Sequence, residues 1–364
     1  MRRTRLPDWR GIRLAALWGV HKFGLPAGLA HSVLLGSVGA GTRIARGSCV
    51  MGRKARIGRD VNIGRRTDIV AEVVDIEDGV HVGDDVKIHC RTLVLRKGSQ
   101  IGDRSVVYGI LTPNSGLELG EHAWIYPDCH INTDERVTIG ARSAAGSHCL
   151  VFTHSSYLPI TQGYPVTIAP VTIGEDAWLP WHAFILPGAR IGRGATVGAF
   201  SLVGGEVPEY CLAVGVPARV VKDAATYRRT YSPEAMRKLG AKITEECVQR
   251  VATSFRPRRI FFASHRSWER VRDGLWSISD GQSTVQVCLL PVVAAESIPP
   301  ASPQVLFLTL GESRPLEEDF ADLVTQRSRI GGTIHPLLRE VLDEFTTYGI
   351  RFAWHADASE PGST

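Results

Sequence analysis

The chain has 364 residues, of which 44% are hydrophobic and 22% are charged, a composition that excludes a disordered chain and a membrane-embedded one. A single core usually stops growing at roughly 250 residues, so we expect two structural units. The net charge of +5 comes from 42 basic and 37 acidic residues and excludes nucleic acid as the main partner.

The seven cysteines are widely spread and include no C-x-x-C pair. This spacing argues against a disulfide framework and against a zinc knuckle. We therefore expect a protein of the reducing cytoplasm.

Residues 1–35 combine basic and apolar residues, but Arg13 and Lys22 interrupt the apolar stretch, as they would not in a signal peptide. We interpret this segment as a helical lead-in that caps the next unit, since repeat folds need capped ends. The alternative is a basic, apolar helix that rests on a membrane surface and makes the protein membrane-associated.

Aliphatic residues recur every six positions in the middle of the chain. The longest unbroken run consists of Ile173, Leu179, Ile185, Ile191, Val197 and Val203. Upstream, the same spacing occurs in sets of three that begin at Val38, Ile57, Ile76, Leu95, Leu119 and Ile139. A helix would need a period of 3.6 residues, so this pattern predicts short strands instead.

Small, uncharged residues lie two positions before these aliphatic residues, as at Val171, Ala177 and Ala183. Residues two apart on a strand share a face, so both series point inward. Glycine often follows the aliphatic residue, as a tight corner would require. Three strands close one triangular coil, and about eight coils stack into a mainly β column over residues 36–222 with a packed interior.

The six-residue step is broken twice, between Val107 and Leu119 and between Val151 and Ile173. Loops that leave a rigid scaffold are common places for functional sites. The second loop begins with His154 directly after a strand, so the scaffold can hold this histidine. An imidazole with an ordinary pKa near 6.5 suits a general base at neutral pH.

Two stretches carry a resemblance to a known family. They are VTIGARSAAGSHCLVFTHSSY, which contains His154, and the sequence from Gly163 through Val214-Gly215-Val216-Pro217-Ala218-Arg219 to Lys222. They resemble the hexapeptide-repeat acyltransferases, in particular the maltose, galactoside and xenobiotic acetyltransferase group, over about half the chain. The resemblance implies a left-handed parallel β-helix, a homotrimer with sites at the seams, and acetyl-CoA as co-substrate.

The same resemblance implies roles for individual residues. His154 is the catalytic base, Trp178 lines the site, and Asp128, Asn132 and Asp134 contact the acceptor or orient the histidine. Ala183, Ala199 and Ser201 follow the pantetheine arm of the donor, and Arg219 and Lys222 meet its phosphates. Pro180, Trp181 and His182 depart from the glycine-rich family pattern, which puts the size of the acyl group in doubt.

Purely structural interpretations of these residues stay open. Asp128, Asn132 and Asp134 are equally suited to corners of the column, because Asp and Asn adopt turn conformations easily. Arg219 and Lys222 are suited to an ordinary solvated surface. Cys149 falls in the inward series, so we assign it to the core rather than to a covalent acyl-enzyme.

Residues 223–364 change character and predict a small α/β domain of unknown role. Ser232 and Pro233 favour a helix start, and apolar residues at helical spacing continue to Phe255. Further expected elements are strands at 259–263, 284–293, 305–310 and 350–354 and helices at 316–326 and 336–347.

The resemblance thus implies direct transfer of an acetyl group from acetyl-CoA, and by analogy the acceptor is a sugar hydroxyl of a surface polysaccharide or its precursor. Alternatives are N-acetylation of an amino sugar or another small amine, and a scaffold without activity. A zinc enzyme on the same fold needs two histidines five residues apart, a spacing that no pair here has. No metal is expected.

Overall fold

The computed structural model describes residues 36–155, 158–253, 266–279, 283–289, 305–309, 320–322, 328–329 and 336–345. The lead-in of residues 1–35, with its predicted cap or membrane contact, lies outside them, as do the strands expected at 259–263 and 350–354. The chain divides into two compact units, Met1–Arg229 and Thr230–Thr364. Within the described residues, no helix has the length and apolar character needed to span a membrane.

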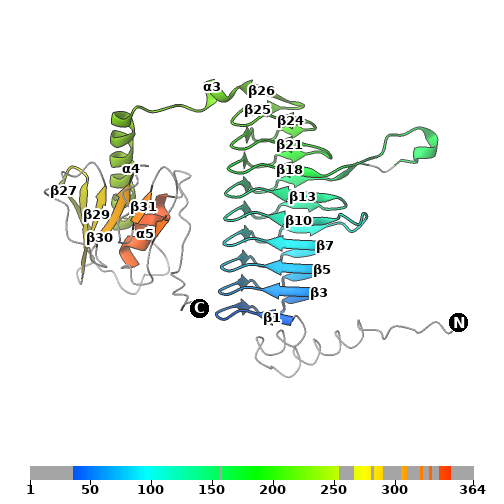
Figure 1. The fold of residues 1–364 in the computed structure, drawn as a ribbon, viewed down its shortest axis with the longest axis horizontal. Coiled ribbons are helices and arrows are strands. Elements are labelled where there is room, and N and C mark those ends of the chain that lie inside the picture. The colour runs from blue at the N-terminus through cyan, green and yellow to red at the C-terminus, as the bar shows by residue number, and fades with distance from the viewer. Residues whose placement is uncertain are drawn as a thin grey trace, which may run out of the picture. The chain divides into compact units, whose positions relative to one another are not determined.

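The first unit is a parallel β-solenoid of about nine turns, whose strands stack turn upon turn (Figure 1). Each turn passes through three faces. Face 1 contains β1 (Gly36–Val38), the second halves of β3 (Cys49–Ile57), β5 (Asp68–Ile76) and β7 (Lys87–Leu95), then β10 (Gly116–Leu119), β13 (Arg136–Ile139), β18 (Val171–Ile173), β21 (Arg190–Ile191) and β24 (Glu206–Val207).

The other two faces are built in the same way. Face 2 contains β2 (Arg43–Ile44), β4 (Asn62–Ile63), β6 (His81–Val82), β8 (Gln100–Ile101), β11 (Trp124–Ile125), β14 (Ala144–Ala145), β19 (Trp178–Leu179), β22 (Thr196–Val197), β25 (Leu212–Gly215) and β26 (Ala218–Lys222). Face 3 contains the first halves of β3, β5 and β7, then β9 (Val106–Tyr108), β12 (His130–Asn132), β15 (Leu150–Val151), β20 (Phe184–Ile185) and β23 (Leu202–Val203).

The inside of the column is the core predicted from the two inward series. Ile63, Ile125 and Leu179 have no exposed surface, and their small neighbours Ala123 and Ala177 are buried with them. Inward hydroxyls are paired between turns, as where Thr67 donates to the carbonyl of Gly83 at 2.7 Å. The predicted fold class is therefore confirmed as a solenoid with a packed interior.

The solenoid has about nine turns rather than the predicted eight. The additional turn contains the buried residues Val207 and Ala213, on β24 and β25. Val207 follows Val203 by four positions, so a search for six-residue steps ends one turn early. The final strand, β26, then folds back antiparallel onto β25.

The glycines that follow the aliphatic residues are needed for close approach, not for a left-handed backbone. At Gly39, a Cβ would lie 2.5 Å from the backbone carbon of Gly58 in the next turn. The left-handed conformation occurs two positions later in the corner and is adopted mostly by other residues. Their φ values lie between 53° and 63° at Asp60, Arg66, Asp85, Arg104, His122, Asp128, Arg142, His148, Asp176, His182, Phe200 and Tyr210.

The first unit also contains two short helical segments among its described residues. The 3-10 helix η1 (Ile160–Gln162) lies within the long loop, and α3 (Ala224–Tyr227) follows β26. The side chain of Asp223 caps α3 by accepting a hydrogen bond from the Thr226 N–H at 2.9 Å.

In the described part of the second unit, two helices pack with a six-stranded mixed sheet. The sheet order is β27 (Ser267–Arg272), β28 (Leu275–Ser279), β29 (Thr284–Leu289), β30 (Val305–Thr309), β31 (Phe320–Asp322) and β32 (Ser328–Arg329). The helices are α4 (Pro233–Thr253) and α5 (Pro336–Glu344). Val251, Trp276, Ile278 and Phe345 belong to one buried core that joins both helices to the sheet.

Most expected elements of this unit are present within the described residues. The side chain of Ser232 accepts from the Ala235 N–H at 3.2 Å, so it caps α4 as predicted. The prediction of a helix at 316–326 is wrong at Phe320–Asp322, which form strand β31. These residues pair with both β30 and β32. Strands β27, β28 and β32 were not expected.

Candidate active site

His154 lies near the start of the segment between β15 and β18, in which the chain extends far out from the solenoid (Figure 1). It begins β16 (His154–Ser155), which pairs antiparallel with β17 (Thr167–Ile168). The preceding residue, Thr153, is fully buried, and its carbonyl accepts from the Ala169 N–H at 2.9 Å. The wall of the solenoid therefore fixes the backbone that carries this histidine.

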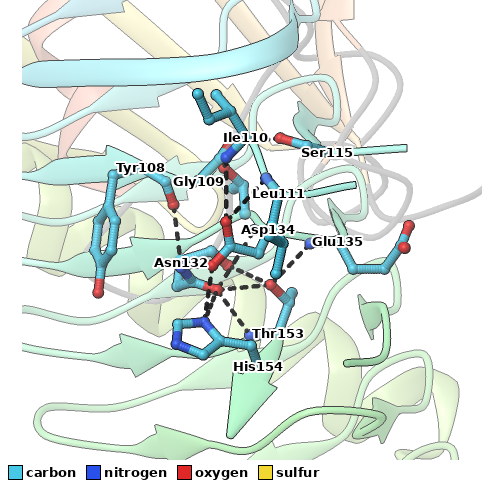
Figure 2. Close-up of polar contacts among 11 residues, drawn as sticks. Tyr108, Gly109, Ile110, Leu111, Ser115, Asn132, Asp134, Glu135, Thr153 and His154 are labelled. Carbon is cyan, nitrogen blue, oxygen red and sulfur yellow. Dashed lines mark hydrogen bonds and ion pairs between the residues drawn. The ribbon is translucent and has the colours of Figure 1, made fainter. Parts of the chain in front are cut away.

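Two oxygen atoms face the same nitrogen of the His154 ring (Figure 2). Nδ1 lies 3.0 Å from Oδ1 of Asn132 and 2.8 Å from Oδ2 of Asp134. The orientation of the amide follows from its other contacts, because its Nδ2 donates to Oδ2 of Asp134 at 2.9 Å. Both neighbours of Nδ1 are thus acceptors, so in the neutral imidazole Nδ1 carries the proton and Nε2 keeps its lone pair.

Asn132 is held rigidly by its own neighbours. It has no exposed surface, and its Oδ1 also accepts from the hydroxyl of Thr153 at 2.7 Å and from the Thr153 N–H at 3.3 Å. The Thr153 oxygen in turn accepts from the Glu135 N–H at 3.0 Å. This network leaves the imidazole one orientation, and 28% of the His154 side chain stays exposed.

Asp134 connects the histidine to the shorter of the two loops. Its Oδ1 accepts from the N–H groups of Ile110 and Leu111, both at 3.1 Å. The loop starts at Gly109, whose φ is +137° and where a Cβ would lie 2.4 Å from the Asp134 nitrogen. One carboxylate therefore positions both the loop backbone and the His154 ring.

Asp128 and Trp178 do not contact His154. Asp128 sits in a corner and accepts two hydrogen bonds of 2.7 Å from Arg104, which lowers the pKa of that carboxyl below its usual range. Trp178 lies on face 2, in edge contact with Tyr126 and Trp181 at 6.1 and 6.0 Å between ring centres. Of the predicted acceptor residues, only Asn132 and Asp134 meet the histidine.

The predicted donor residues lie in the last turns. Ala183 and Ser201 point into the core, and the Ser201 hydroxyl accepts from the Gly215 N–H at 3.0 Å, so only their backbone can face a ligand. Ala199 is an exposed corner residue. Arg219 and Lys222 are exposed on β26, and neither forms an ion pair with a described residue.

Sequence reasoning missed an aromatic column on the corner between faces 2 and 3. The rings of His148, His182 and Phe200 stack at 4.9 and 4.6 Å between centres. Trp181 beside them is 54% exposed. In the sequence, this aromatic column is marked by bulky residues that replace the corner glycines. Thr153 and Tyr108 were also missed, because single Thr and Tyr residues carry no motif.

Cys149 is fully buried, as expected for a core residue. The side chain of Cys129 interacts with it and lowers the pKa of its thiol, but the sulfur faces the carbonyl of Pro180 at 3.1 Å inside the column. Among the described residues, no three His, Cys, Asp or Glu side chains are arranged to hold a metal ion.

Comparison with curated proteins finds relatives that match part of the chain. One, from Escherichia coli K12 and named as a colanic acid biosynthesis acetyltransferase, WcaF, is 33% identical over 136 residues, which span 36% of this chain and 74% of the relative. Another from that organism, named as a lipopolysaccharide biosynthesis O-acetyl transferase, WbbJ, is 35% identical over 104 residues, or 26% of this chain and about half, 53%, of the relative.

Among solved structures, a maltose O-acetyltransferase from Clostridium difficile 630 matches with 24% identity and a TM-score of 0.33, over 37% of this chain and 70% of that one. No protein-family profile matches the sequence.

Proposed function

This chain belongs to the hexapeptide-repeat acetyltransferase family, and we propose that it transfers the acetyl group of acetyl-CoA directly to a sugar hydroxyl, with His154 as general base. One observation carries the proposal. Nδ1 of His154 is occupied by Asn132 and Asp134, so the lone pair of Nε2 is available to the acceptor.

Proton transfer then follows the geometry of the histidine. The acceptor O–H gives its proton to Nε2 as its oxygen attacks the thioester carbon. When the tetrahedral intermediate collapses, the carbon–sulfur bond breaks, and the imidazolium returns the proton to the leaving thiolate. The Asp134 carboxylate, 2.8 Å from Nδ1, stabilises the imidazolium between these steps.

The donor would bind along the last turns of the solenoid. Arg219 and Lys222 are exposed and are not neutralised by a described acidic residue, which suits the phosphates of coenzyme A. The backbone near Ala183, Ala199 and Ser201 would accompany the pantetheine arm. Trp178 does not meet His154 within one chain, so we propose that a homotrimer brings it there from a neighbouring copy.

A sugar of a surface polysaccharide, or its precursor, is the acceptor class that we propose. The support is that WcaF and WbbJ are named for the biosynthesis of colanic acid and of lipopolysaccharide. The tightly held histidine, whose side chain stays partly exposed, argues for catalysis rather than for a scaffold role.

The test is release of free thiol from acetyl-CoA in the presence of a panel of hexoses and amino sugars. We expect His154→Gln to lower kcat by about 10² to 10⁴-fold with unchanged thermal stability, because a general base supplies a factor of this size. His81→Gln, which removes an exposed histidine from face 2, is the matched control. Full turnover by a folded His154→Gln variant would refute the proposed base.

A further inference from the structure

Acyl transfer from a thioester forms an oxyanion that needs a hydrogen-bond donor. Backbone N–H groups often supply it, but eight of those near His154 are already used within the protein. The following each donate to a protein oxygen: the N–H groups of Gly109, Ile110, Leu111, Thr112, Thr133, Asp134, Glu135 and Thr153. The described backbone beside the histidine therefore offers none of these groups to a substrate.

Tyr108 is the side-chain donor that lies next to this network. It is paired with Asn132 in the ladder between β9 and β12, and its carbonyl accepts from the Asn132 amide at 3.4 Å. In Figure 2 the Tyr108 ring lies beside Asn132, and its hydroxyl end points to the side of Asn132 on which the His154 imidazole lies. The residue is 37% exposed, and its hydroxyl has no hydrogen-bond partner among the described residues.

The environment keeps this phenol protonated. Partial burial raises the pKa of Tyr108 above its usual value, and the negative charge of Asp134 raises it further. A neutral phenol is a hydrogen-bond donor, which is the form that an oxyanion requires. The same carboxylate that stabilises the imidazolium thus also holds its neighbour in the donating state.

We propose that the Tyr108 hydroxyl donates a hydrogen bond to the oxyanion of the tetrahedral intermediate. This inference rests on the proposed function, since the oxyanion exists only if an acyl group is transferred. The phenol keeps its proton throughout. It stabilises the negative oxygen while His154 holds the proton taken from the acceptor, and the bond weakens when the carbonyl re-forms.

Steady-state kinetics of Tyr108→Phe test this role. We expect kcat to fall by about 10² to 10³-fold, the usual effect of removing one oxyanion donor, with KM for both substrates changed by less than about threefold. Circular dichroism and the melting temperature should match those of the wild type. Tyr231→Phe, which removes a phenol hydroxyl from the chain segment before α4, is the matched control.

Two results would overturn the inference. One is an unchanged kcat in Tyr108→Phe, and the other is a raised acceptor KM with kcat intact, which would make Tyr108 an acceptor contact only. Failure of the proposed function is distinguishable, because the wild-type protein would then release no thiol with any acceptor. An active wild type, an inactive His154→Gln and a fully active Tyr108→Phe would refute the role of Tyr108 alone.

Discussion

The tautomer of the neutral His154 ring is decided by which atoms surround Nδ1. Asn132 presents Oδ1 because its Nδ2 is already bonded to Asp134, and Asp134 presents a carboxylate oxygen. Only one tautomer satisfies both contacts. Under the proposed function, the two side chains therefore act through the imidazole, which they position.

Replacing Asp134 by Asn tests this positioning. The new amide can turn an N–H towards Nδ1, which favours the tautomer that is unsuited to a base. We expect kcat to fall by about 10²-fold, less than in a triad with a single orienting carboxylate, because Asn132 still accepts from Nδ1. Kinetics with acetyl-CoA and the acceptor identified in the panel would measure it.

Asp128→Asn provides the matched control. Asp128 pairs with Arg104 in a corner and has no contact with the histidine, so its variant should keep near wild-type kcat. An equal loss in both variants would argue against a specific role for Asp134.

At the scale of elements, the loop of residues 109–115 depends on a glycine. The φ of Gly109 is +137°, a conformation that other residues rarely adopt. A Cβ at this position would also lie only 2.4 Å from the backbone nitrogen of Asp134. The loop and the carboxylate of Asp134 are packed against each other at this point.

Gly109→Ala should therefore displace Asp134 and disturb the histidine. We expect a loss of about 1–3 kcal/mol in the free energy of unfolding, from backbone strain, together with reduced kcat. Urea unfolding and kinetics would measure both effects. Gly205→Ala is the control, because no atom lies within 4 Å of its added Cβ, and an equal effect there would refute the argument.

The repeat made the solenoid predictable, because every turn places the same pair of side chains in the same core. The ninth turn was not predicted, because the step from Val203 to Val207 is four residues and breaks the six-residue period. The position of His154 at the start of a long loop was predictable from the break in the repeat, while its catalytic role stays a prediction. Tyr108 and Thr153 were not, because their roles come from stacking of turns that are about twenty residues apart in the chain.

The second unit has no repeat, so its strands had to be inferred from local apolar runs. Phe320–Asp322 lies in a segment with helical apolar spacing but forms a strand, because pairing with two neighbours outweighs local preference. The corners of the solenoid show the same limit. Their left-handed residues are mostly Asp, Arg and His, which composition alone does not mark as corners.

At the scale of the whole molecule, the two units have separate buried cores. We predict that they unfold as separate cooperative units. The Ile278 side chain is fully buried among residues of the second unit, so its truncation should leave a cavity there.

Ile278→Ala should thus lower the stability of the second unit by about 2–5 kcal/mol and leave acetyl transfer unchanged below its unfolding transition. Differential scanning calorimetry should show one transition moving while the other stays. A shift of both transitions together would show that the units unfold as one.

The reversal at β26 also sets the length of the column. Parallel strands could in principle be added to the upper edge of face 2 indefinitely, and a second molecule could continue the stack. β26 instead runs antiparallel to β25 and carries Arg219 and Lys222. An incoming parallel strand meets the wrong polarity and two positive charges, so this edge is protected from fibre-like growth.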